Sequence, residues 1–289
     1  MKFSFIIKPK QKEREKLVDV IDTGTSELLC EIRDRVALVT LNKPDKKNAL
    51  GDKLSPALRQ ILLTLEHRAD VGCVMITGAG DAFCAGGDVS EMGNSTSAEP
   101  PRTVEERIAE LTERQLALTG RLYYFPKPTI AALPGAAAGA GLSIALACDL
   151  RVAADTAFLL TAFRNVGLSG DYGATWFLPR LVGLARAKSL FYRSTRLTAD
   201  NAFVIGLIDE VFPATSFRQD AFAYAREIAD GPTEALTRMK NNLQSGAEQS
   251  LEASFALEAK HMIESGGSAE AHEAIHAFMQ KRKPLFHRI

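Results

Sequence analysis

One carboxylate stands out in the sequence because of the residues around it. Asp171 lies in the stretch GLSGDYGATWFLPR (167–180), among glycines, small residues and large apolar side chains. Aspartate is a favoured cap at the start of a helix, where it typically contributes about 1 kcal/mol. Apolar neighbours such as Tyr172 and Trp176 would also desolvate the carboxylate, which raises its pKa and makes it a stronger base. The stretch therefore leaves two roles open for Asp171, a helix cap and a general base.

Two glycine-rich segments have the composition of turns that bind anions. CAGGD (84–88) and GAAAGAG (135–141) each follow an apolar run and precede a helical pattern. Amides at the start of a helix are free donors at the positive end of the helix dipole, and glycine lets a ligand approach them. Two such turns facing one point would form an oxyanion hole; close packing and phosphate binding are the alternatives. Neither segment has the glycine spacing of a dinucleotide site or the lysine of a P-loop.

Other catalytic and metal-binding groups lack suitable spacing. The five histidines lie at the end of one helical pattern or in the C-terminal region, so no Ser–His pair is indicated, and we expect no metal site. The four cysteines are far apart in the sequence, which favours free buried thiols in a reducing compartment. These residues are His67, His261, His272, His276 and His287, and Cys30, Cys73, Cys84 and Cys148.

The charge balance argues against polyanionic partners. The 289 residues include 35 basic and 35 acidic side chains, whereas binding to nucleic acid or an anionic membrane needs a basic excess. The apolar run near the N-terminus spans only five residues, too few for a signal peptide, and no later run approaches the length of a membrane span. We therefore expect a cytoplasmic protein with no membrane or nucleic-acid partner.

The first two-thirds of the chain alternates between strand and helix patterns. Apolar runs predict strands near 35–44, 71–80, 129–135 and 150–155. A helix is predicted between the first two, with an apolar face formed by Leu54, Leu58, Ile61, Leu62 and Leu65. A capping box at Thr103 and Glu106 opens another helix, and a small-residue turn and helix follow Gly135. This alternation is typical of an α/β fold with a parallel sheet and right-handed crossovers.

After Pro213 the sequence predicts only helices, near 216–230, 232–245, 248–265 and 267–281. Four such helices need partners for their apolar faces, which indicates an assembly role. The patterns predict a β/α core up to residue 215 and a C-terminal helical oligomerisation module (216–289). The boundary between an N-terminal extension (1–28) and the core (29–215) is set by where the resemblance given in the next paragraph begins.

Four motifs in family order resemble the crotonase (enoyl-CoA hydratase/isomerase) superfamily. They are LVTLNKPDKKNAL (38–50), DAFCAGGDVSEM (81–92), PGAAAGAGLSIALACDL (134–150) and AFMQKRKPLF (277–286). The resemblance implies a spiral of ββα units, a trimer or dimer of trimers, and an acyl-CoA thioester as ligand. Because coenzyme A is then part of the substrate, no separate cofactor is expected. The resemblance places the oxyanion hole at the amides of Gly87 and Ala140. The substrate-binding residues that it implies are Lys46, Lys47, Ala49, Ala85, Asp88, Ser143, Phe163, and, reaching a neighbouring subunit, Phe278 and Lys281.

The resemblance also narrows the reaction. The two glutamates of the family's hydratases fall on Ser143 and Phe163, so hydration by that pair is not expected. Asp171 falls where dienoyl-CoA isomerases carry an acid and chlorobenzoyl-CoA dehalogenase carries its nucleophile. The pattern D-x-G-x-T-W-x-L-P-R-x-x-G, from Asp171 to Gly183, resembles the epoxyphenylacetyl-CoA isomerase branch. This implies an isomerase that shifts a double bond or opens an epoxide with Asp171 as its single base. Hydration or hydrolysis at the same site, and a catalytically silent acyl-CoA-binding protein, are the alternatives.

Overall fold

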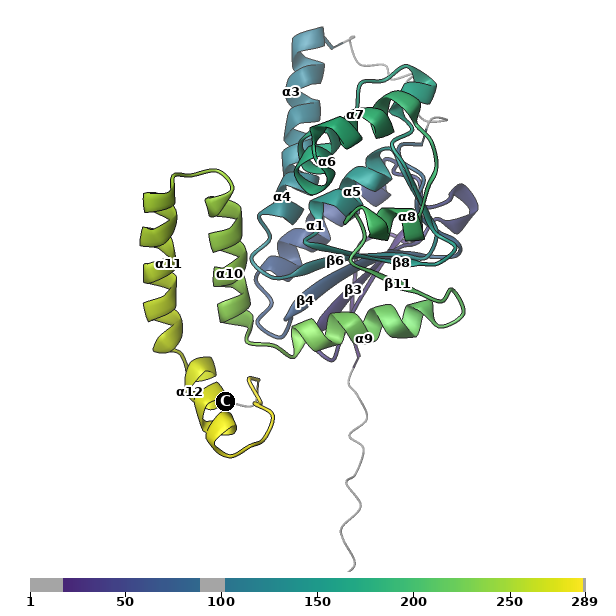
Figure 1. Ribbon diagram of the computed structural model, residues 1–289. Coiled ribbons are helices and arrows are strands. Elements are labelled where there is room, and N and C mark those ends of the chain that lie inside the picture. The colour runs from purple at the N-terminus through teal and green to yellow at the C-terminus, as the bar shows by residue number, and fades with distance from the viewer. Residues whose placement is uncertain (1–17, 89–101, 288–289) are drawn as a thin grey trace, which may run out of the picture.

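A mixed seven-stranded sheet forms the centre of the protein (Figure 1). The computed structural model describes residues 18–88 and 102–287. The strand order is β1 (Asp19–Ile21), β2 (Leu28–Arg33), β3 (Val36–Leu41), β4 (Cys73–Gly78), β6 (Thr129–Leu133), β8 (Leu150–Ala154) and β11 (Glu210–Phe212). The strands from β3 to β11 are parallel, as predicted, but β1, β2 and β3 pair in an antiparallel manner. Strands β2 and β3 are antiparallel because the turn between them, at Asp34 and Arg35, is too short for a crossover connection. Both turn residues have positive φ, as hairpin turns require.

A second, smaller sheet packs beside the first and carries the glycine turns. It contains β10 (Leu197–Thr198), β9 (Phe158–Leu160), β7 (Ala136–Ala138) and β5 (Ala82–Cys84), in that order. The pairs β4–β5, β6–β7 and β8–β9 each place one strand in each sheet before the next helix, which gives repeated ββα units. These strands of two or three residues are too short to show a hydrophobic period, and the sequence did not predict them as a sheet.

Helices cover both faces of the large sheet, with α9 on one side and α1, α5, α6 and α7 on the other (Figure 1). All five residues predicted for the apolar face of α1 are buried. The helices are α1 (Leu54–Glu66), α3 (Val104–Gln115), α4 (Arg121–Tyr123), α5 (Ala140–Ala147), α6 (Ala174–Val182), α7 (Leu184–Arg193), α8 (Ala199–Val204), α9 (Phe217–Ala229), α10 (Thr233–Gly246), α11 (Leu251–Gly266) and α12 (Ala269–Met279). Shorter turns are η1 (Pro44–Lys46), the π turn η2 (Leu116–Gly120) and η3 (Phe163–Val166).

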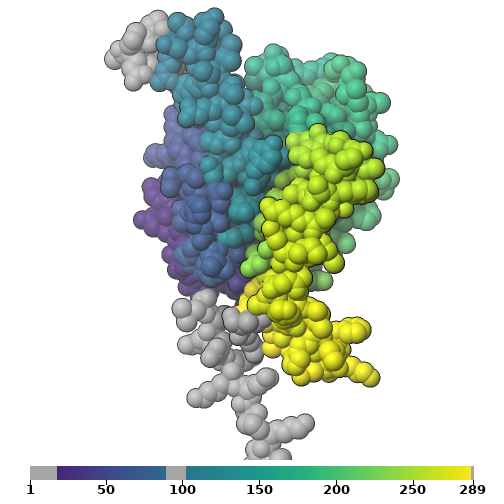
Figure 2. Space-filling view, turned by 90° about the vertical axis from the view of Figure 1, so that its left-hand side faces the viewer, coloured from purple at the N-terminus to yellow at the C-terminus, as the bar shows by residue number. Residues whose placement is uncertain are grey.

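The structure refines the three predicted regions. The predicted boundary at residue 29 falls inside β2, and β1 precedes it in the same sheet, while residues 1–17 lie outside the described residues. At the other boundary, α9 buries Phe217, Ala221 and Ala225 and contacts the sheet, so it belongs to the body. Helices α11 and α12 stand away from the body, whereas α10 is bonded to it through Lys240 and Gln244, and the three helices form a ridge along one face (Figure 2).

The capping box predicted at the start of α3 is confirmed. The Thr103 hydroxyl accepts a hydrogen bond from the Glu106 amide (3.1 Å), and the Glu106 carboxylate accepts one from the Thr103 amide (2.8 Å). Because α3 has no buried residues, packing contributes little to its first turn, and we expect the capping box to be a main source of its stability.

Replacing Thr103 with alanine should destabilise that first turn by about 1 kcal/mol, because the Glu106 amide then loses its acceptor. We expect amide exchange near the start of α3 to become about fivefold faster, the factor that about 1 kcal/mol implies, measured by mass spectrometry. Thr112→Ala, within the same helix, removes a hydroxyl that bonds only the Ile108 carbonyl and should leave the first turn unchanged. Equal exchange in the two variants would contradict a capping role.

Candidate active site

The first glycine turn is fixed to the loop that follows β3. The Leu50 amide donates to the Gly86 carbonyl (2.7 Å), the Asp88 amide to the Leu50 carbonyl (2.8 Å), and the Ala85 amide to the Lys47 carbonyl (2.9 Å). These bonds hold two segments that are over thirty residues apart in sequence as one rigid unit. The Gly87 amide takes part in none of these three bonds.

The second glycine turn touches the first. Gly86 and Gly139 both have positive φ (+101° and +52°), a conformation that side chains disfavour. A Cβ built on Gly86 would lie 3.1 Å from the Ala138 carbonyl oxygen and 3.5 Å from the Ala140 amide nitrogen. The two turns are thus in contact, and Ala140 is the first residue of α5. That the amides of Gly87 and Ala140 bind an oxyanion stays a prediction.

Asp171 does not cap a helix. Gly173 occupies the N-cap position of α6, and no side chain caps that helix. The Asp171 Oδ1 atom is buried with no hydrogen-bond partner in the structure. Burial without a compensating donor raises the pKa of this carboxyl above its ordinary value of 3.8. Of the two roles left open by the sequence, the structure excludes the cap. The role of Asp171 as a general base stays a prediction.

Positive φ angles shape the backbone around this carboxylate. Gly170 (+108°), Tyr172 (+49°) and Gly173 (+78°) all adopt the left-handed region. A tight loop with three such residues in four positions turns the chain sharply before α6 begins.

Phe163 lies between the glycine turns and the Asp171 loop. Its side chain is buried, and its ring stacks on Phe191 with centroids 6.0 Å apart. The two edges of the ring face different parts of the site: Cε1 is 3.9 Å from a Cβ built on Gly139, and Cδ2 is 3.8 Å from one built on Gly170. An apolar wall therefore spans the space where the resemblance places a hydratase glutamate.

Ser143 is fully buried and links the same two segments. Its hydroxyl donates toward the Asp171 carbonyl oxygen (3.0 Å) and lies 3.2 Å from the Gly139 carbonyl oxygen. With its hydroxyl directed to main-chain acceptors and no histidine as hydrogen-bond partner, Ser143 is not arranged as a nucleophile.

The predicted residues around the first turn form ion pairs. Asp88 is buried, and its Oδ2 accepts from Lys46 Nζ (2.8 Å) and Lys43 Nζ (3.3 Å). Lys47 Nζ lies 2.7 Å from Asp81 Oδ1 at the surface. The geometry thus supports a positional role for Asp88, while direct contacts of these lysines with a ligand stay predictions. The remaining predicted contacts differ in exposure: Ala49 is buried and Ala85 is exposed.

The single chain does not bring Phe278 and Lys281 to this region. Phe278 lies near the end of α12 and is 84% exposed, and Lys281 follows that helix. Figure 1 shows α12 far from α5 and α6. A role for these two residues in the active site therefore requires a second copy of the chain, which stays a prediction.

Sequence reasoning missed one residue, Asn48, and one contact of the predicted residue Ser143 that hold the site together. The Asn48 side chain, fully buried, donates to the Ala79 carbonyl (2.9 Å) and the Ala82 carbonyl (2.8 Å). The contact between Ser143 and the Asp171 carbonyl joins residues 28 positions apart. No pattern in the sequence reports such contacts, because they depend on how the two sheets stack.

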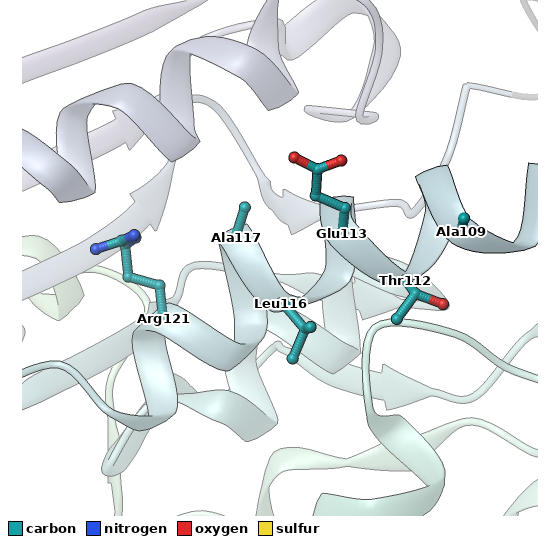
Figure 3. Close-up of a pocket in the computed structure, with 6 residues that line it drawn as sticks. All are labelled: Ala109, Thr112, Glu113, Leu116, Ala117 and Arg121. Carbon is teal, nitrogen blue, oxygen red and sulfur yellow. The ribbon is translucent and has the colours of Figure 1, made fainter. Parts of the chain in front are cut away.

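The pocket in Figure 3 lies elsewhere, along α3 and η2. It is lined by Ala109, Thr112, Glu113, Leu116, Ala117 and Arg121, none of which belongs to the predicted site. Arg121 pairs with Glu66 of α1. This pocket therefore offers no assembled acid–base pair.

The cysteines are not arranged as nucleophiles. All four cysteines are free and buried, and burial raises the pKa of Cys30, Cys84 and Cys148 to about 12. Within residues 18–88 and 102–287, no three His, Cys, Asp or Glu side chains are grouped to hold a metal ion. No helix in the same residues is long and apolar enough to cross a bilayer.

Comparisons with known proteins identify the family of the chain. The family model for Enoyl-CoA hydratase/isomerase matches residues 31–288. The "Probable enoyl-CoA hydratase" of Rhodobacter capsulatus is 36% identical over 89% of this chain and 96% of its own length. The 1,2-epoxyphenylacetyl-CoA isomerase of Escherichia coli is 34% identical over 90% and 97%. The crystal structure of an enoyl-CoA hydratase from Polaromonas sp. JS666 superposes with a TM-score of 0.82 at 32% identity, covering 89% of this chain and 98% of that one. The chain therefore belongs to the enoyl-CoA hydratase/isomerase family and has the crotonase fold.

Proposed function

We propose that this protein is an acyl-CoA isomerase that uses Asp171 as its single base. The observation that carries the proposal is the buried Asp171 Oδ1 atom, which has no hydrogen-bond partner and whose carboxyl has a raised pKa. An acid held in this state, on a loop that Ser143 bonds to the helix after the second glycine turn, is equipped to accept and return a proton. The relative named 1,2-epoxyphenylacetyl-CoA isomerase supports the same chemistry.

The proposed reaction needs two groups. Asp171 takes a proton from the carbon α or γ to the thioester, and the electron pair of that C–H bond moves to the thioester oxygen. The amides of Gly87 and Ala140 donate to this developing oxyanion, an arrangement worth roughly 3–4 kcal/mol per donor. Asp171 then returns the proton to a different carbon; with an epoxide next to the enolate, the electron pair instead forms a C=C bond as the epoxide C–O bond breaks, and Asp171 gives its proton to the released oxygen. Coenzyme A is part of the substrate, and the reaction needs no separate cofactor.

Hydration at the same site is the second candidate. It is favoured by relatives named as hydratases, among them the one from Rhodobacter capsulatus. Against the usual two-carboxylate mechanism, Ser143 has its hydroxyl directed to main-chain oxygens and Phe163 cannot transfer a proton. Hydration here would depend on Asp171 alone activating a water.

Isotope labelling separates these reactions. The wild-type protein is incubated with 3-enoyl-, dienoyl- and epoxide-bearing acyl-CoA thioesters, in deuterated water and separately in ¹⁸O-labelled water. An isomerase exchanges substrate protons for deuterium and forms a product of unchanged atomic composition. A hydratase adds labelled oxygen to the acyl chain, and a thioesterase places it in the released acid. Binding of the thioesters with neither exchange nor turnover would contradict the proposal and favour a silent acyl-CoA-binding protein.

A homo-oligomer is the second part of the proposal. Helices α10, α11 and α12 expose a dense set of large apolar side chains, which isolated surface helices rarely do. These are Met239, Leu243, Leu251, Phe255, Met262, Ile263, Ile275, Phe278 and Met279. We propose that a second and third copy of the chain cover this surface in a trimer or dimer of trimers.

Introducing glutamate at both Phe255 and Met262 should disrupt that assembly. The two side chains line the groove between α10 and α11, and buried unpaired carboxylates cost several kcal/mol each. We expect the molar mass measured by light scattering to fall from that of an oligomer to that of a monomer. Gln249→Glu, in the exposed loop between the same helices, is the matched control. An oligomer that survives the double substitution would place the interface elsewhere.

A further inference from the structure

The carbonyl group of Asp171 is held more firmly than its carboxylate. The carbonyl oxygen accepts two hydrogen bonds, one from the Ala174 amide (3.2 Å) and one from the Ser143 hydroxyl (3.0 Å). The carboxylate, by contrast, has a buried Oδ1 atom with no donor. The orientation of this side chain is therefore set through its main chain.

This arrangement has a chemical advantage for a base. A donor bonded to a carboxylate stabilises its charged form and lowers its affinity for a proton. A donor bonded to the adjacent carbonyl fixes the position of the residue and leaves the carboxylate oxygens free for the substrate. The hydroxyl of Ser143 supplies such a donor from a fully buried position in α5.

The same hydroxyl is close to the second glycine turn. It lies 3.2 Å from the Gly139 carbonyl oxygen, one residue before the Ala140 amide. Helical serines often bond the carbonyl four residues back, and this contact alone would be only a local feature of α5. The contact with Asp171 is not local, since it joins α5 to the loop before α6.

We propose that Ser143 is a positioning residue, which holds the base Asp171 at a fixed place relative to the amide of Ala140. The hydroxyl acts through the main chain of both segments and touches no reacting atom. This inference rests on the proposed function, because it assigns Asp171 the role of the base. Ser143 would then position the base, whereas the hydratase glutamate that the resemblance places at residue 143 acts on the substrate water.

The test compares Ser143→Ala with a matched variant, Thr77→Val. Thr77 is likewise buried and donates one hydroxyl bond to a carbonyl, that of Ala132, but this bond joins β4 to β6 in the large sheet. Both variants lose one buried hydroxyl bond, so both report the general cost of that loss. Ser143→Cys keeps the size of the side chain and a weak donor, and serves as a partial rescue.

We expect Ser143→Ala to lower kcat and the rate of deuterium exchange by roughly 10- to 100-fold, since small displacements of a base are costly, and to change KM by less than about twofold. Amide exchange at Tyr172 and Gly173 should become faster, and Ser143→Cys should lie between alanine and wild type. Thr77→Val should retain the wild-type kcat.

Two results would overturn the inference: a wild-type kcat in Ser143→Ala, or an equal loss in Thr77→Val. Failure of the proposed function is distinguishable, because the wild-type protein would then turn over none of the thioesters. Amide exchange of the Asp171 loop would still test the positioning role of Ser143 in that case. If exchange in Ser143→Ala were as slow as in wild type, the hydroxyl would not hold the loop.

Discussion

Asp171→Asn should lower the rates of isomerisation and of solvent deuterium exchange by roughly 10²- to 10⁴-fold, the usual contribution of a general base. Asparagine keeps the shape of the side chain but cannot accept the substrate proton. Because the proposed oxyanion donors are main-chain amides, binding of the thioester, measured by calorimetry, should change little. Rates in Asp171→Asn equal to wild type would refute the assignment of the base.

The kcat/KM of the wild-type enzyme should depend on pH in the range where Asp171 titrates. The pKa of Asp171 is raised by burial, so the carboxylate becomes protonated at a higher pH than an ordinary aspartate. We expect kcat/KM to fall as the pH decreases through that raised pKa, with a midpoint above 3.8. A midpoint at or below 3.8 would show that the titrating group is not the buried Asp171.

The same substitution should stabilise the protein at neutral pH. The folded state holds the Asp171 proton more tightly than the unfolded state, so ionisation weakens the fold as the pH rises from 3.8 to the folded pKa. Asparagine carries no charge and avoids this ionisation penalty, so the variant should be the more stable of the two proteins at neutral pH. The gain should be full above the folded pKa, decrease as the pH falls and vanish below 3.8, as measured by denaturant unfolding.

An exposed aspartate provides the control for these effects. Asp200 lies in the first turn of α8 at the surface. Asp200→Asn removes the same charge from the chain and should leave both the rate and its pH dependence unchanged. A shared loss of activity in the two variants would indicate an effect of net charge instead of a loss of the base.

The parts of the fold that the sequence predicts are those with long periodic patterns. The buried face of α1 from Leu54 to Leu65 repeats at helical spacing, and β4 is a run of six buried residues. Such patterns specify an element without reference to the rest of the chain. The short strand β7 in AAA and the antiparallel hairpin at Asp34 have no such local signal, and tertiary packing decides them.

The candidate site divides in the same way. Its proposed base, Asp171, and its glycines are visible in the sequence because their chemistry is unusual at those positions. The roles of Ser143 and Asn48 are not, because a buried hydroxyl or amide acquires its partner only when distant segments meet. The interpretation of Asp171 as a helix cap failed for a related reason. The chain turns through Gly170, Tyr172 and Gly173. The N-cap residue of α6 is therefore Gly173, which has no side chain to cap the helix.

Gly141→Ala should weaken both stability and catalysis, because α5 packs against β5 with no space for a side chain at this position. A Cβ on Gly141 would lie 2.4 Å from the carbonyl oxygen of Cys84 and 2.7 Å from its Cβ. Neither atom belongs to a flexible side chain end, so the helix itself must move. Such overpacking typically costs about 1–3 kcal/mol in the free energy of unfolding.

The movement also changes the predicted oxyanion hole. Gly141 adjoins Ala140, whose amide is one of the two proposed donors, and Cys84 lies just before the turn that carries the other, Gly87. Separating these segments should weaken one donor, for which a loss of roughly 10²- to 10³-fold in kcat is typical. Asp171 lies on a different segment, so the pH at which kcat/KM falls should stay as in wild type.

The two consequences of Gly141→Ala are separated by measuring activity well below the melting temperature, where the variant remains folded. Gly266→Ala is the matched control, since a Cβ there meets nothing within 4 Å and the residue lies at the end of a helix. Alanine is the better helix former, so this control should be neutral or slightly stabilising. If Gly141→Ala were destabilised but fully active, the contact between α5 and β5 would support the fold without positioning the donors. A loss of kcat with an unchanged pH profile would instead locate the damage at the oxyanion and not at the base.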